Sequence, residues 1–226
     1  KSFKRFLNPP YHFKEQVEKE IPYTKKQLEI IYGGNEKKEQ RIKGVVGSGK
    51  TIVLAARAVQ AVKRTDEEIL ILTYNITLKN YIKDKISKVR ENFNWTNFII
   101  LNYHLFINTE LNNIGVEIKV PEKFDENTEE FKEEYFEKNY YSNLKLFEEH
   151  KEKLKRYSAI FIDEIQDYKR PWMDIIKIYF LKEDGEYVLF GDVKQNIYNN
   201  KIENKDISTN VKGVNELKNS FRSDYK

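Results

Sequence analysis

The residues with the clearest chemical potential form a glycine-rich loop at residues 44–51. The run Gly44-Val45-Val46-Gly47-Ser48-Gly49-Lys50-Thr51 fits the pattern G-x-x-x-x-G-K-[ST] at every constrained position. In such a loop the glycines let backbone N–H groups turn towards phosphate oxygens, and the N-terminus of the following helix adds a favourable dipole. Lys50 is then expected to reach the β- and γ-phosphates of a nucleotide, and the Thr51 hydroxyl to bind Mg²⁺. The predicted binding residues are Gly44, Gly47, Ser48, Gly49, Lys50 and Thr51.

Two adjacent carboxylates, Asp163 and Glu164, directly follow the apolar run 159–162. Ligands of α/β sheets bind at the carboxyl ends of the strands, so we expect this pair near the glycine-rich loop. Asp163 suits Mg²⁺, which prefers oxygen ligands, and Glu164 is placed to activate a water molecule as a general base. Alone, the pair would be read as a solvated strand end. Combined with the loop, it predicts a catalytic site.

The elements that must position these residues alternate between strands and helices. Buried strands are predicted at 40–46, 68–74, 98–101, 159–163 and 187–192, and helices at 25–32, 52–62, 78–89 and 172–179. Thr24 is expected to cap the first helix. Near-continuous apolar strands that alternate with helices indicate a parallel sheet covered on both faces. The expected fold is therefore α/β, of the P-loop NTPase class.

Residues 121–156 differ from the rest, with eleven acidic residues against eight basic ones. Phe136, Tyr140, Leu144 and Phe147 recur at spacings of four, four and three, which favours a helical insertion with one apolar stripe. Aromatic stripes of this kind usually pack in a core, so we assign no ligand to it.

The composition excludes several kinds of site and of protein. The chain has 226 residues, a net charge of +4 and no cysteine, which rules out disulfides and thiolate metal sites. No apolar run reaches membrane-spanning length, so we expect a cytoplasmic protein without membrane contact. The charge is too small to indicate a nucleic-acid partner by itself. The start at Lys1 and the end soon after 220–223 suggest a piece of a longer protein.

A set of motifs resembles those of UvrD/Rep-type superfamily 1 helicases. Ile162-Asp163-Glu164-Ile165-Gln166-Asp167 resembles their D-E-x-Q-D form of the Walker B motif. Residues 191–198 are similar to their third motif, G-D-x-x-Q-S-I-Y, with Asn196 in place of the usual serine. Four shorter runs resemble further motifs: 23–27 the glutamine motif, 72–78 the motif Ia variant of helicases that follow a nuclease-related domain, 102–104 the T-F-H element, and 220–223 the N-Y-R-S motif.

The resemblance implies a RecA-like motor domain that hydrolyses ATP with Mg²⁺. It implies that Gln27 reads the adenine edge and that Asp163 supports Mg²⁺ while Glu164 activates water. It also implies that Gln195 senses the γ-phosphate. Arg222 is expected to approach the γ-phosphate as well, because the negative charge that develops there during hydrolysis needs a cation. Catalytic roles thus fall to Lys50, Glu164, Gln195 and Arg222.

The resemblance further implies movement on single-stranded nucleic acid, with DNA expected before RNA. Tyr74, Asn75, Tyr103 and His104 are expected to border the nucleic-acid groove, where an aromatic ring can stack on a base. We divide the chain into a first motor part (1–105), an inserted helical subdomain (106–156) and a second motor part (157–226).

The other expected partner is a second RecA-like domain of the same full-length chain. We expect the full-length protein to be a monomer. Residues 1–226 alone should bind nucleotide weakly and hydrolyse it poorly, because the second domain supplies the other wall of the cleft. A nucleotide-gated binding module without translocation is the alternative, although a pure switch needs neither Glu164 nor Gln195. A P-loop kinase is a second alternative, but the D-E-x-Q-D and G-D-x-x-Q motifs are not expected together in a kinase.

Overall fold

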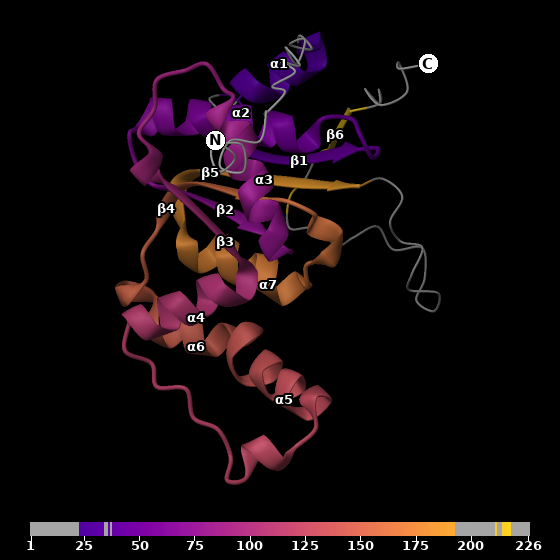
Figure 1. Cartoon of the computed structure of the whole chain (residues 1–226). Helices are drawn as coiled ribbons and strands as arrows, with labels where there is room; N and C mark the ends of the chain where they lie inside the picture. Colours follow the sequence, from indigo (N-terminus) through magenta and orange to yellow (C-terminus); the bar gives the residue numbers. More distant parts are fainter. Residues whose placement is uncertain (1–22, 34–35, 37, 193–210, 212–213, 218–226) are drawn as a thin grey trace, which may run out of the picture.

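A computed structural model of the chain describes residues 23–33, 36, 38–192, 211 and 214–217 (Figure 1). Its described part contains a six-stranded sheet in which every pairing is parallel, in the order β3-β2-β4-β5-β1-β6. The strands are β1 (Glu39–Gly44), β2 (Ile69–Thr73), β3 (Phe98–Asn102), β4 (Tyr157–Ile162), β5 (Leu181–Asp192) and β6 (Val214–Leu217). The predicted fold class, a RecA-like P-loop NTPase sheet, is confirmed.

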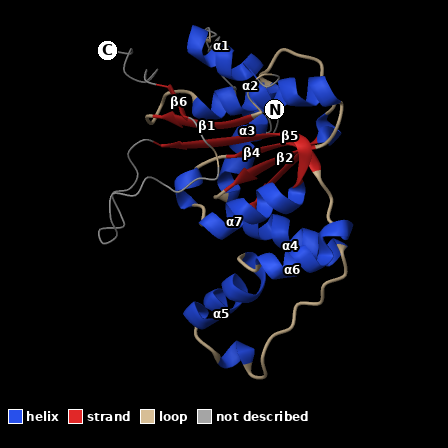
Figure 2. Cartoon of the chain, turned by 180° about the vertical axis from the view of Figure 1, so that it is seen from behind, coloured by secondary structure: helices blue, strands red, loops and turns tan. Residues whose placement is uncertain are grey.

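Helices cover both faces of the sheet (Figure 2). One face carries α1 (Lys25–Tyr32), α2 (Lys50–Thr65) and α3 (Ile76–Ser87), and the other carries α4 (Tyr103–Asn113), α6 (Leu144–His150) and α7 (Arg170–Ile175). Successive residues of β2 alternate between the two cores: Ile69 and Ile71 face α2 and α3, whereas Leu70 and Leu72 face α4 and α7. All five residues of β2 are buried, as a parallel sheet between two helical layers requires.

Several element boundaries differ from the predicted ones. Strand β5 begins at Leu181 rather than at residue 187, and further differences lie at the glycine-rich loop. The first strand ends at Gly44 rather than at residue 46, and Val46 is 61% exposed. The chain must leave the sheet at Gly44 in order to turn into the loop, so β-branched residues beyond it do not extend the strand. Helix α2 begins at Lys50, earlier than predicted. Strand β6 was not predicted, because its four residues carry no apolar run.

Two helices of the predicted insertion belong to the core of the sheet domain. Phe106 and Ile107 of α4 and Phe147 of α6 are buried in the same cluster as β2 and β4. The segment between these helices, residues 114–143, projects from the domain and is called the arm below (Figures 1 and 2). The division at 106 and 156 stays a prediction, but α4 and α6 pack against the parallel sheet as parts of the same core.

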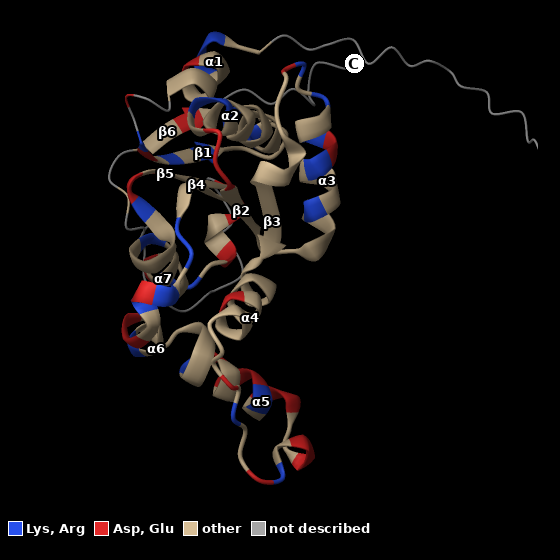
Figure 3. Ribbon diagram, turned by 90° about the vertical axis from the view of Figure 1, so that its left-hand side faces the viewer, with Lys and Arg blue, Asp and Glu red and all other residues tan. Residues whose placement is uncertain are grey.

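The arm carries α5 (Glu129–Phe136) and a π-helical turn (Glu137–Tyr141). Phe124 packs edge-on against Tyr135 and Phe136, with ring centroids 5.3 and 5.6 Å apart. Acidic residues predominate in α5, whereas basic residues recur along α3 on the sheet domain (Figure 3). The arm therefore has a small aromatic core of its own and a surface of the opposite charge to α3.

No helix in the described ranges is long and apolar enough to cross a membrane.

Candidate nucleotide site

The glycine-rich loop connects β1 to α2 and depends on all three of its glycines. Gly47 and Gly49 both have φ of 82°, a left-handed conformation that L side chains rarely adopt. A Cβ on Gly44 would collide with the Ser48 hydroxyl and lie 3.2 Å from the Lys50 side chain. The loop can therefore close tightly over the N-terminus of α2, which suits it to an anion.

The Lys50 ammonium group is folded back against the loop. It donates to the carbonyl oxygens of Gly44 and Val45, at 3.1 and 3.4 Å, and forms an ion pair with Asp192 Oδ1. Asp192 lies there because β1 and β5 are neighbours in which Gly44 is opposite Asp192. Asp192 was not among the predicted site residues. The available signal was its position at the end of an apolar strand, next to the glycine of the third motif.

Gln27 lies directly against the loop. Its Nε2 donates to the Ser48 carbonyl oxygen at 3.3 Å, and its Oε1 accepts from the backbone N–H of Thr24 at 2.9 Å. Thr24 in turn accepts from the Gln27 backbone N–H, so the two residues form a capping box at the start of α1. The side chain of Gln27 is 3% exposed. Its role towards adenine stays a prediction.

Asp163 is a buried carboxylate with one unsatisfied oxygen. The residue is 1% exposed, Oδ1 accepts from the Glu164 backbone N–H at 3.1 Å, and Oδ2 has no hydrogen-bond partner among the described residues. Burial, followed by the charge of Glu164, raises the pKa of Asp163 to about 7. A buried oxygen without a partner is costly unless a cation or donor meets it. The residue therefore fits Mg²⁺, as does the partly exposed Thr51 at the first turn of α2.

Glu164 follows at the start of a 3₁₀ turn, η7 (Ile165–Asp167). Its Oε2 accepts from Gln166 Nε2 at 2.6 Å, and Gln166 Oε1 accepts from the Asp192 backbone N–H at 3.3 Å. A continuous set of polar contacts thus connects Glu164 with Gln166, Asp192 and Lys50. Gln166 lies within the predicted D-E-x-Q-D motif but was not among the predicted site residues.

The four residues predicted to border nucleic acid lie in different environments. Tyr74, after β2, is 50% exposed, and Asn75 caps α3 by accepting from the Thr77 N–H at 3.0 Å. His104 is partly exposed and packs edge-on against the Tyr141 ring at 4.6 Å, and burial lowers the pKa of its imidazole.

The prediction for Tyr103 needs correction. Its ring is 1% exposed and stacks on Trp172 with centroids 4.4 Å apart, and its hydroxyl donates to the Tyr141 carbonyl at 2.7 Å. A ring whose face is covered by Trp172 has no surface left for a base. The predicted catalytic residues Gln195 and Arg222 lie outside the described residues.

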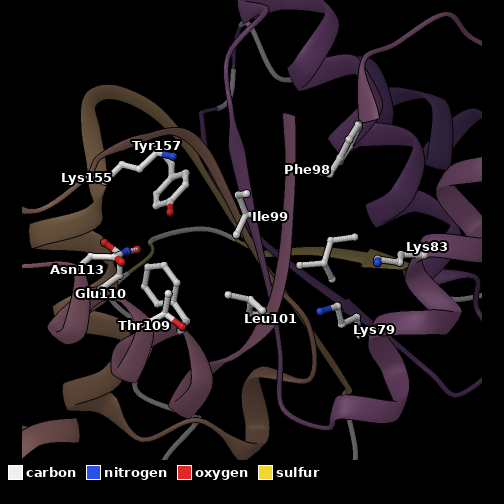
Figure 4. A pocket seen from close by; sticks show the side chains of 12 residues that line it. Lys79, Lys83, Phe98, Ile99, Leu101, Thr109, Glu110, Asn113, Lys155 and Tyr157 are labelled. Atoms are coloured by element: carbon white, nitrogen blue, oxygen red, sulfur yellow. Dashed lines mark hydrogen bonds between the residues drawn. The ribbon is translucent and has the colours of Figure 1, made fainter. Parts of the chain in front are cut away.

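A separate groove of about 430 Å³ runs along β3, the edge strand (Figure 4). Ile99 and Leu101 form part of its lining, Lys79 and Lys83 come from α3, and Glu110 comes from α4. In the sheet order, β3 is four strands away from β1, or about 19 Å at the usual spacing of neighbouring strands. The groove is therefore distinct from the glycine-rich loop.

Comparison with known families and structures adds to this description. The family described as "AAA domain" matches residues 27–201, more than half of the chain. No curated relative matches it in sequence. Similar solved structures include the Pif1 helicase from Candida albicans, which is 14% identical with a TM-score of 0.47 over 89% of this chain and 41% of that one.

Two further solved structures come from bacteriophages. The UvsW helicase of bacteriophage T4 is 10% identical, with a TM-score of 0.46 over 74% of this chain and 52% of that one. The large terminase of a thermophilic bacteriophage is 12% identical, with a TM-score of 0.45 over 75% of this chain and 39% of that one. The chain thus spans between about two fifths and a half of the lengths of these three proteins.

Proposed function

The chain belongs to the AAA domain family, and from this premise we propose that it is the N-terminal ATP-binding domain of a superfamily 1 helicase of the UvrD/Rep type. In this proposal the domain hydrolyses ATP with Mg²⁺ and couples the reaction to movement on, or unwinding of, nucleic acid. Its partners are single-stranded DNA, before RNA, and a second RecA-like domain of the same full-length chain.

The observation that carries the proposal is the connection between the phosphate-binding loop and the acidic pair. Lys50 pairs with Asp192, and the Asp192 backbone is bonded to Gln166, which holds Glu164. Lys50 for phosphate, the buried Asp163 for a cation and Glu164 for water all follow the carboxyl ends of β1 and β4, on either side of β5. This is the group set that phosphoryl transfer to water needs, because its catalysis is mainly positioning and charge stabilisation.

Each residue has a defined task in the proposed reaction. The loop N–H groups and Lys50 bind phosphates, so Lys50 exchanges the Asp192 carboxylate for phosphate oxygens. Thr51 and Asp163 would hold Mg²⁺, which when bound neutralises charge on the β- and γ-phosphates. Glu164 accepts a proton from the attacking water. Gln27 would contact the base, and Gln195 and Arg222 the γ-phosphate, as the motif resemblance implies.

The decisive experiment measures ATP turnover by the full-length protein with and without single-stranded DNA, beside the variant Glu164→Gln. Turnover that rises with DNA and is abolished by Glu164→Gln is the expected result. Nucleotide-dependent binding of a partner without turnover would instead support the binding module. Turnover that Glu164→Gln leaves unchanged would refute the proposed catalytic site.

A further inference from the structure

The Gln166 side chain contacts two functional parts of the site at once. Its Nε2 lies 2.6 Å from Glu164 Oε2, and its Oε1 lies 3.3 Å from the backbone N of Asp192. The carboxylate can only accept and the backbone N–H can only donate, so the chemistry of both partners fixes the orientation of the amide. Gln166 therefore bonds the Glu164 carboxylate to the end of β5.

The backbone around Gln166 is closely fitted to the same strand end. Glu164 has a φ of 53°, a left-handed conformation that is rare for a residue with a side chain. A Cβ on Gly191 would come within 2.6 Å of the Ile165 side chain and 3.1 Å of Gln166 Oε1. Glycine at 191 lets the turn pack this closely, so the strand end supports the amide.

The support also carries the phosphate-binding lysine, because the Asp192 side chain pairs with Lys50. Gln166 thus fixes Glu164 relative to the residue that binds phosphate, and the distance between these two groups determines where an attacking water can be activated. Displacement of a catalytic group by about 1 Å can reduce a rate by roughly a hundredfold.

We propose that Gln166 is a positioning residue that orients the Glu164 carboxylate for attack by water and anchors it to the end of β5. The proposal rests on the proposed ATP hydrolysis. It differs from a purely structural role in the turn, because it requires the hydrogen bond that Gln166 donates to Glu164 in addition to its bond with the Asp192 backbone.

Two variants separate the two ends of the amide. Gln166→Met removes the hydrogen bonds to Glu164 and to the Asp192 N–H at similar volume, whereas Gln166→Glu keeps an acceptor for the Asp192 N–H but places a carboxylate against Glu164. In the full-length protein with Mg²⁺ and single-stranded DNA at pH 8, both variants should lower kcat by about tenfold or more. The KM for ATP, and the affinity for a non-hydrolysable ATP analogue, should stay within about twofold of the parent, since neither variant alters a phosphate ligand.

Gln60→Met is a matched control. Gln60 Nε2 also donates to a glutamate, Glu91 Oε1 at 3.2 Å, but it lies ten residues along α2 from Lys50, or about 15 Å. This variant should keep the parental kcat. Thermal melting of all three variants shows whether they fold. The kcat values of Gln166→Glu and Gln166→Met are compared with that of the parent only if each variant melts as a folded protein.

The outcomes are distinguishable. A Gln166→Glu variant with parental kcat would overturn the proposal, because only the Asp192 contact would then matter. A changed analogue affinity with an intact kcat would overturn it too, in favour of a structural role in the loop. If Glu164→Gln itself left turnover unchanged, the proposed function would fail, and with it the assignment of Gln166.

Discussion

The Lys50 ammonium group and the Asp192 carboxylate form an ion pair in which the side chains are only 8% and 7% exposed. The pair joins the phosphate-binding loop to the neighbouring strand β5, whose residue 192 lies opposite Gly44. Charges buried to this degree are costly unless they are paired, and removal of one partner leaves the other uncompensated. Asp192 therefore compensates the loop lysine in the protein alone, and a bound nucleotide must take over that task.

Asp192→Asn should destabilise the nucleotide-free protein by about 3 kcal/mol, the cost typical of breaking a buried pair from one side. Phosphate oxygens would supply the lost charge, so a saturating non-hydrolysable ATP analogue should remove much of the deficit. Urea unfolding with and without the analogue measures both values. Asp184→Asn is the control: Asp184 pairs with Lys38 at 3.1 Å but is 96% exposed, so its loss should change stability little. An equal deficit for Asp192→Asn in both conditions would contradict this account.

Asp163 should make stability depend on pH in the protein without Mg²⁺. Its pKa is raised from 3.8 to about 7, so between these values the folded state binds a proton that the unfolded state releases. The contribution is complete below about pH 4 and is lost as pH rises through about 7, at about 1.4 kcal/mol per pH unit. Asp163→Asn, which cannot ionise, should flatten this slope, and its advantage over the parent should appear at pH 8 but not at pH 4. Parallel stability curves for the parent and the variant would show that Asp163 does not titrate in this range.

Gly44→Ala should impair nucleotide binding by about tenfold or more, the loss expected when one loop contact worth about 1.4 kcal/mol is removed. The added methyl would collide with the Ser48 hydroxyl and press on the Lys50 side chain, so the loop could not close. Gly33→Ala is the matched control, because among the described residues a Cβ there meets only Gln40, at 3.9 Å, and φ is −73°. Titration with a fluorescent ATP analogue compares the two. Similar affinities for both variants would show that the loop tolerates a side chain at 44.

The parts of the fold that were predicted correctly depend on local patterns. The apolar runs of β2 and β4 and the loop glycines are visible within a few residues of sequence, and Thr24 and Gln27 form their capping box within a single turn. These features need no knowledge of distant segments. For the same reason the class of the fold followed from the order of strands and helices.

The missed parts depend on pairings between distant segments. Asp192 reaches Lys50 only because β5 lies between β1 and β4, and Gln166 finds its partner on that same strand. Tyr103 was assigned to nucleic acid because it follows a strand end, yet Trp172 of α7 covers its ring. Such contacts cannot be inferred from either segment alone.

Tyr74 is the aromatic residue of the predicted set that keeps an exposed ring. It is 50% exposed after β2, and its ring is T-shaped to that of Tyr168 with centroids 6.4 Å apart. Loss of a ring that stacks on a base costs about 1–3 kcal/mol, so Tyr74→Ala should weaken binding of a single-stranded oligonucleotide by about tenfold or more. Fluorescence anisotropy of a labelled oligo-dT in the full-length protein measures this affinity.

Two other tyrosines make the test specific. Tyr81 on α3 is 45% exposed, but Lys85 lies over its ring at 4.8 Å and it does not follow a strand end, so Tyr81→Ala should keep the parental affinity. Tyr103→Phe should also keep it, while losing about 1 kcal/mol of stability with the hydrogen bond to Tyr141. If Tyr103→Phe weakened oligonucleotide binding and Tyr74→Ala did not, the nucleic acid would have to displace Trp172 from the Tyr103 ring. The nucleic-acid-binding groove would then lie against α7 and the arm instead of at the end of β2.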